Sequence, residues 1–190
     1  MKFKHIKIIL LATLSFMSVA SATEERFFGD IIDYGENYLS PEFIASHDGK
    51  TILVGCKTGD KVLTIKNDKV SSSLDLGARV SGLCVAKDGT AYATLFGENG
   101  KLVKIKTSPK LEKQAECIVG NFQNAPVVSA DVKFVYLANQ FTNVVRKLDS
   151  ETGKELAKGK AVHEPVAMQL TPDGKELLVV NHLPEPKCGL

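Results

Sequence analysis

Pairs of short apolar runs recur along the chain, and each pair is joined by a turn that contains aspartate. The turns begin at Asp48, Asp88, Asp131 and Asp173, so successive turns lie 40, 43 and 42 residues apart. Three of the four aspartates are followed by glycine, which adopts the positive φ angles that a tight hairpin needs. The pattern therefore predicts an antiparallel pair of strands at each of four places.

In the first three units a second turn and two further runs follow, the third alternating and the fourth weaker. The strands that we expect are 43–46, 51–55, 61–65 and 73–76; 83–86, 91–96, 101–105 and 114–119; 127–130, 134–138, 144–148 and 155–157; and 166–170 and 176–180. Four short antiparallel strands in about 40 residues are typical of one blade of a β-propeller. No 3.6-residue periodicity is sustained beyond the first 22 residues, so the predicted class is all-β.

Two of the second runs end in a motif that resembles a known repeat. The segments 136–139 (Tyr-Leu-Ala-Asn) and 178–181 (Leu-Val-Val-Asn) are similar to the YVTN repeat of bacterial β-propellers, and the likeness covers about residues 41–183. The resemblance implies a β-propeller with blades of four antiparallel strands, typically about seven of them, whereas the number of units in this chain predicts an incomplete or small ring. It implies no single function, because the family includes surface-layer proteins, lactonase-like enzymes and propellers fused to c-type cytochromes.

The first two units lack the terminal asparagine of this motif, at 53–56 and 93–96. We interpret Asn139 and Asn181 as turn-forming residues, because asparagine at a strand end bonds to neighbouring backbone. The predicted division of the chain is a signal peptide at 1–22, a strand or linker at 23–40, repeats at 41–183 and a tail at 184–190. Within the repeats the units are 41–80, 81–123, 124–164 and a partial unit at 165–183.

The first 22 residues have the pattern of a secretory signal peptide. Three lysines precede an apolar run at 8–19, and Ala20-Ser21-Ala22 supplies the small residues that a signal peptidase recognises, with Ala20 and Ala22 at the cleavage positions. An uncleaved N-terminal anchor is the alternative, although the run is short for a span of about 30 Å of hydrocarbon. We therefore expect a periplasmic or extracellular protein.

Charge and composition exclude some classes of protein. The chain has 24 basic and 22 acidic residues, and three of the lysines lie in the leader, which leaves 21 basic and 22 acidic groups and a net charge of −1. No basic patch suited to nucleic acid remains. The chain has no Trp, which argues against propellers whose repeats each carry a Trp.

After export, the cysteines of the chain would be in an oxidising compartment. There are four of them: Cys56, Cys84, Cys117 and Cys188. Three full pairings are possible and the sequence does not choose among them. Buried free thiols are the alternative for Cys56 and Cys84, which lie in strand-like runs.

About three and a half units do not make a typical ring, since propellers usually have 4–8 blades. An uncapped terminal unit exposes its apolar face. Three explanations stay open. The chain is part of a longer propeller, which we favour, or it closes as four blades with a strand at 26–34, or two copies join in self-association through their open blade edges.

The sequence contains no motif for covalent haem, phosphate binding, zinc proteolysis or a serine nucleophile, and it indicates no catalytic residue, metal ligand set or cofactor. The candidate site is the loop face around the propeller channel, for which we expect the residues Arg79, Asn124, Asn139, His163 and His182. The two histidines could form a pair for metal binding or proton transfer, whereas His47 is expected in a turn on the opposite face.

The sequence therefore favours an exported β-propeller module that binds an unknown protein or small-molecule ligand. The alternative is the N-terminal part of a lactonase-like enzyme or of a cytochrome-fused electron-transfer propeller.

Overall fold

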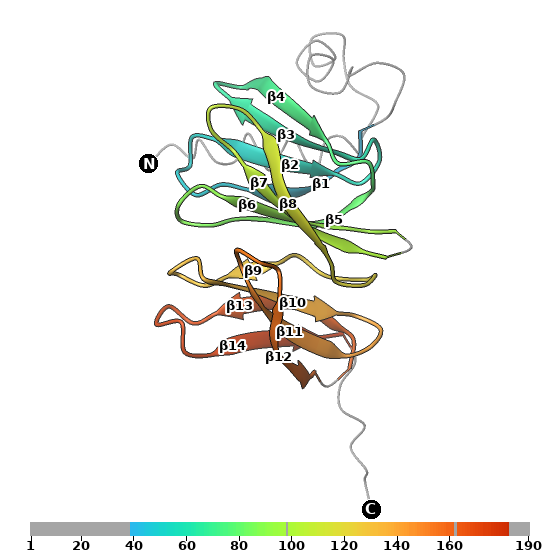
Figure 1. Cartoon of the computed structure of the whole chain (residues 1–190). Coiled ribbons are helices and arrows are strands. Elements are labelled where there is room, and N and C mark those ends of the chain that lie inside the picture. Colours follow the sequence, from blue (N-terminus) through green and yellow to red (C-terminus); the bar gives the residue numbers. More distant parts are fainter. Residues whose placement is uncertain (1–38, 98, 162, 183–190) are drawn as a thin grey trace, which may run out of the picture.

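The computed structural model describes residues 39–97, 99–161 and 163–182, and in these residues it has strands and turns but no helix. Three four-stranded antiparallel sheets are followed by one two-stranded sheet (Figure 1). The strands of the first two sheets are β1 Pro41–Ala45, β2 Ile52–Cys56, β3 Lys61–Lys66, β4 Lys69–Asp75, β5 Val80–Val85, β6 Ala91–Leu95, β7 Lys101–Lys106 and β8 Glu112–Ile118. The others are β9 Val127–Val128, β10 Phe134–Asn139, β11 Val144–Asp149, β12 Glu155–Lys160, β13 Pro165–Leu170 and β14 Leu177–Asn181.

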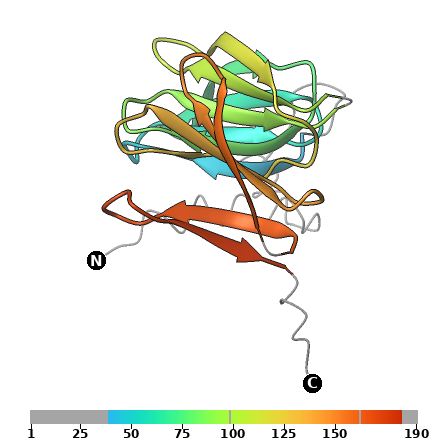
Figure 2. The same ribbon diagram turned by 60° about the horizontal axis from the view of Figure 1, so that its bottom comes forward.

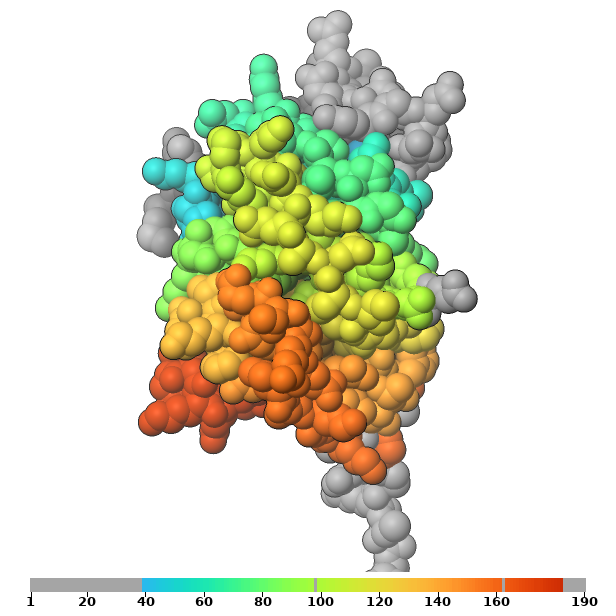
Figure 3. Space-filling model, viewed as in Figure 1, coloured from blue at the N-terminus to red at the C-terminus, as the bar shows by residue number. Residues whose placement is uncertain are grey.

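Each sheet is a meander in which consecutive strands pair, as a propeller blade requires. The predicted class, an all-β chain of four-stranded antiparallel blades, is confirmed. The fourth strands β4 and β12 are longer than their predicted runs, because β4 begins at Lys69 and β12 continues to Lys160, and the first strand β5 likewise begins early, at Val80. The outer strands β4 and β12 are largely exposed (Figure 3), so they need no apolar alternation and an apolar run marks them poorly.

The four aspartate turns have one construction and join the first two strands of each sheet. The Asp48 carboxylate accepts hydrogen bonds from the backbone N–H groups of Thr51 at 2.7 Å and Lys50 at 2.8 Å. These amides lower the pKa of Asp48 to about 2. Equivalent hydrogen bonds join backbone N–H groups to the carboxylates of the other three turns. The donors are Thr90, Lys133 and Lys175, and the acceptors are Asp88, Asp131 and Asp173 respectively. Val132 adopts the left-handed conformation (φ 60°) in the third turn, where the other turns have glycine.

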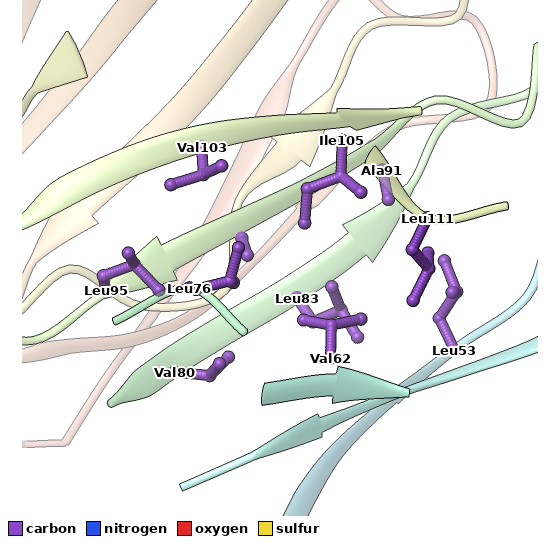
Figure 4. Close-up of a cluster of buried hydrophobic side chains, with 11 residues drawn as sticks. Leu53, Val62, Leu76, Val80, Leu83, Ala91, Leu95, Val103, Ile105 and Leu111 are labelled. Carbon is purple, nitrogen blue, oxygen red and sulfur yellow. The ribbon is translucent and has the colours of Figure 1, made fainter. Parts of the chain in front are cut away.

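The core lies between sheets rather than within one. Leu53 and Val62 from the first sheet meet Leu83, Val103 and Ile105 from the second (Figure 4). The opposite face of the second sheet packs against the third through a cluster that includes Tyr92, Leu102, Val135, Leu137 and Leu148. All five residues of β6 are buried, because apolar layers cover both faces of this sheet. The sheets therefore stack face to face, like neighbouring blades.

The last sheet, β13–β14, forms the end of this stack (Figure 2). Along β14 the side chains alternate, so that Leu177 and Val179 are half-buried whereas Leu178 and Val180 are 55% and 57% exposed. One face of the terminal sheet is therefore apolar and uncovered. The predicted strand at 26–34 lies outside the described residues.

Cys56, Cys84 and Cys117 are free thiols, so no disulfide joins the three described cysteines. Cys56 is fully buried, which agrees with the buried-thiol alternative, and Cys84 is half-buried. Cys188 and the leader lie outside the described residues. No helix in the described part of the chain has the length and apolar character to cross a bilayer.

Candidate functional site

Loops within and between the first three sheets meet at one end of the strands. We use the term loop face for the segments 76–79, 119–126 and 139–143 together with Phe96, Gly97 and Gly100. Backbone hydrogen bonds tie these segments together: Phe96 N–H donates to the Arg79 carbonyl at 2.8 Å, and Gly120 N–H donates to the Gly100 carbonyl at 3.1 Å. The face is thus held by main-chain bonds between loops that are distant in sequence.

Three phenylalanines and one arginine form a row on this face. The Arg79 guanidinium lies 5.7 Å from the centre of the Phe96 ring, the Phe96 and Phe122 rings are 5.1 Å apart, and the Phe122 and Phe141 rings are 4.3 Å apart. Phe122 is 43% exposed and Phe141 60% exposed. We call Arg79, Phe96, Phe122 and Phe141 the loop aromatic cluster. Exposed aromatic and arginine side chains in one patch are characteristic of binding surfaces.

The central ring of the cluster is held on a strained backbone. Phe122 has φ 61°, a left-handed conformation that costs a residue with a Cβ about 1–2 kcal/mol. Its carbonyl accepts a hydrogen bond from Gln140 N–H at 3.0 Å, which fixes the loop against the next one. Such strain is concentrated at functional sites, where the surrounding structure maintains it.

Side-chain amides fix the loops below the rings. The Asn121 Oδ1 atom accepts from Gly97 N–H at 3.1 Å and Gly100 N–H at 3.0 Å. Buried Gln123 donates through Nε2 to the Val119 carbonyl at 2.9 Å. Asn139 donates to the Asn121 carbonyl and accepts from the N–H groups of Phe141 and Thr142, at 3.1 and 2.8 Å. The amides therefore bind backbone, and the rings and Arg79 form the exposed part of the cluster.

The loop network depends strongly on Asn139, which is 5% exposed. We expect Asn139→Ala to lower the free energy of unfolding by about 2 kcal/mol, because buried backbone groups would lose their partners. Chemical denaturation measures this difference. Gln140→Ala is the matched control, since the Gln140 side chain forms no hydrogen bond within the described residues; equal losses in the two variants would contradict the assignment.

Four of the five residues predicted for the site lie in loops, Asn139 is the last residue of β10, and the five do not form one group. Arg79, Asn124 and Asn139 belong to the loop face described above. Asn124 donates through Nδ2 to the Pro165 carbonyl and so links the loop 119–126 to the last sheet. The Asn139 bonds agree with its interpretation as a turn-forming residue.

The two histidines lie at the last sheet, away from the loop aromatic cluster in sequence. His182 Nδ1 is 3.1 Å from Glu164 Oε2, and His182 N–H donates to the Glu164 carbonyl at 2.9 Å. His182 therefore contacts Glu164, the residue that follows His163 in the sequence. Among the described residues, no group of three or more His, Cys, Asp or Glu side chains is arranged to hold a metal ion. His47 lies in the β1–β2 turn, as expected.

Sequence reasoning missed the three phenylalanines of the cluster. For Phe122 and Phe141 the available signal was the absence of charge: residues 117–130 and 134–145 contain no Lys, Arg, Asp or Glu, although both segments include loops. The segment of Phe96 gives no such signal, because Glu98 follows two residues later. An uncharged loop with a phenylalanine indicates a buried or binding position more than a solvated turn.

Comparisons with known proteins show the fold. The chain is similar to a chain of hydrazine synthase from Kuenenia stuttgartiensis, with a TM-score of 0.68 and 21% identity over 74% of this chain and 42% of that one. It is similar to the β-propeller domain of Cps50 (Swd1) from Myceliophteria thermophila, with a TM-score of 0.58 and 20% identity over 72% and 47%. A proposed 6-phosphogluconolactonase from Bacteroides uniformis gives a TM-score of 0.62 and 19% identity over 76% and 48%. The described sheets are β-propeller blades.

The chain spans less than half the length of each of these three structures. No family model matches the chain, and no curated protein matches it in sequence. Membership of the YVTN family therefore stays a prediction.

Proposed function

We propose that the chain is an exported β-propeller module that binds a partner through the loop face. The observation that supports this function best is the loop aromatic cluster: large apolar rings stay exposed on loops that hydrogen bonds hold in place. Exposed apolar side chains gathered in one patch mark interaction sites on soluble domains. Rigid anchors also lose little conformational entropy on binding.

Export is the second part of the proposal and rests on the leader at 1–22. The basic residues, apolar run and Ala-Ser-Ala sequence are those of a secretory signal. A fusion of the whole chain to a periplasmic reporter is expected to become active outside the cytoplasm. Removal of residues 1–22 should retain the reporter inside the cell.

Photo-crosslinking in the native host tests the binding function directly. We expect the full chain with Phe141→benzoylphenylalanine to give a defined adduct under illumination, because this side chain is close in shape to the exposed ring that it replaces. The control is the same photoreactive group at Ile118, which is 68% exposed on the outer strand β8. Equal labelling at the two positions, or none at position 141, would contradict a specific partner at the loop face.

The alternative is a part of a lactonase-like enzyme. Two observations favour it: the structural similarity to the proposed 6-phosphogluconolactonase, and the Glu164–His182 pair, a carboxylate and an imidazole in contact at 3.1 Å. Hydrolysis of 6-phosphogluconolactone by the full chain, abolished by Glu164→Gln, would support the enzyme. We expect no hydrolysis above the buffer rate.

A further inference from the structure

We propose that the ligand of the loop aromatic cluster is a polypeptide segment in which an apolar side chain lies beside a carboxylate. This inference rests on the proposed function, since it names the class of partner for the same face. The rings of Phe96, Phe122 and Phe141 would contact the apolar side chain, and the Arg79 guanidinium would bind the carboxylate.

The side-chain amides of the loop face already bond to backbone, and the acceptor that stays unpaired, Gln123 Oε1, is buried, which favours a ligand that forms few hydrogen bonds with this face. The side chains of Asn121, Gln123, Asn124 and Asn139 all bond to backbone atoms of the protein. Ligand hydroxyl groups, which need donors and acceptors, would find few there. Apolar side chains need only the rings and the exclusion of water.

The orientation of the rings also argues against a stacked sugar. Phe96 and Phe122 meet at an interplanar angle of 74°, and so do Phe122 and Phe141. Successive rings are therefore edge to face, and they form no flat platform for a pyranose ring. Rings turned in this way form an uneven apolar surface that fits branched or aromatic side chains.

Arg79 supplies the charge that selects a carboxylate. Its side chain is exposed, and no Asp or Glu within the described ranges lies at salt-bridge distance from it. Of the loops that form the face, 119–126 and 139–143 contain no charged residue, whereas the segment between Phe96 and Gly100 contains one, Glu98. A guanidinium binds a carboxylate through two parallel N–H bonds, and nearby apolar groups strengthen this interaction by excluding water.

Phe122 provides a test that separates binding from folding. Because its φ is 61°, glycine would relieve the strain while removing the central ring. If the ring serves only stability, its loss should lower the melting temperature. If the ring serves binding, its loss should lower the affinity for the ligand without lowering the melting temperature.

The experiment uses the purified chain with ring-labelled phenylalanine and three small probes followed by NMR. N-acetyl-L-phenylalanine carries the ring and the carboxylate, N-acetyl-L-phenylalaninamide carries the ring alone, and cellobiose represents a sugar. We expect the acid to shift the Phe122 and Phe141 ring signals with a dissociation constant of about 1 mM. The amide should bind about fivefold more weakly because it lacks the ion pair, and cellobiose should cause no shift. Binding of cellobiose as tight as that of the acid, or equal binding of acid and amide, would overturn the proposal.

Two variants assign the roles, each with a matched control on an outer strand. Phe122→Gly should abolish the shifts without lowering the melting temperature, whereas Ile118→Gly should leave binding intact. Arg79→Gln should reduce the affinity for the acid to that for the amide, whereas Lys158→Gln should not change it. Retained binding in Phe122→Gly would overturn the inference. A specific adduct at position 141 in cells with no binding of the acid would refute the ligand class alone, whereas binding without an adduct would refute the proposed function.

Discussion

A Gly100→Ala variant is expected to lose about 3 kcal/mol of unfolding free energy, because its new methyl group would enter space that backbone already fills. A Cβ at this position would lie 2.1 Å from the Gly120 carbonyl oxygen and 2.8 Å from the Asn121 nitrogen. These are main-chain atoms, so no rotation of a side chain relieves the overlap. The Gly100 carbonyl also accepts hydrogen bonds from Val119 and Gly120, which link the loops of the loop face.

Gly97→Ala is the matched control, since it adds the same methyl group in the same loop. A Cβ on Gly97 meets nothing within 4 Å. We therefore expect its unfolding free energy to stay within about 0.5 kcal/mol of the parent value. Urea denaturation followed by circular dichroism measures both variants. If Gly100→Ala were as stable as Gly97→Ala, the close approach of the two loops would be wrong.

The sequence predicted the second and third strands of each four-stranded sheet well, because their side chains must be apolar to fill the space between sheets. The runs at 51–55 and 91–96 correspond to β2 and β6, whose residues are largely buried. The outer strands were predicted less well, since β12 is exposed along its whole length and its sequence is free to be polar. Strand prediction from apolar runs thus depends on burial rather than on hydrogen bonding.

The candidate site was only half predictable for a different reason. The loops could be assigned to one face from the order of strands and turns, which is how Arg79 and Asn139 entered the predicted site. The proximity of Phe122 to Phe96 and Phe141 depends on contacts between loops of different sheets. It also depends on a left-handed backbone at Phe122, which propensity does not indicate.

The second large effect expected is a loss of stability at alkaline pH. Burial raises the pKa of Cys84 to about 12, and it raises the pKa of Cys56 to about 11 and that of Tyr92 to about 12. Cys84 and Tyr92 are directly opposite each other on β5 and β6, beside the core between the second and third sheets. In all three groups the neutral form is the one that the folded chain accommodates.

Stability falls as the pH rises because the folded chain holds these protons more tightly than the unfolded chain does. Below about pH 8 the three groups are neutral in both states, so the stability is fully present, and the thiols of the unfolded chain begin to ionise above this pH. Between about pH 9 and 12 the unfolded chain releases these protons while the folded chain retains them, which favours unfolding. We expect the free energy of unfolding to fall by roughly 8 kcal/mol across this range. Denaturation at a series of pH values under reducing conditions measures the slope.

The double variant Cys84→Ala, Tyr92→Phe removes two of the three groups and serves as the control. It should start from a lower stability at neutral pH, because the alanine leaves a small cavity. Its free energy of unfolding should nevertheless fall less steeply above pH 9 than that of the parent chain, since only Cys56 among the three groups remains to ionise. Equal slopes in the two proteins would show that these groups do not cause the alkaline loss, and would place the ionisations that drive unfolding elsewhere in the chain.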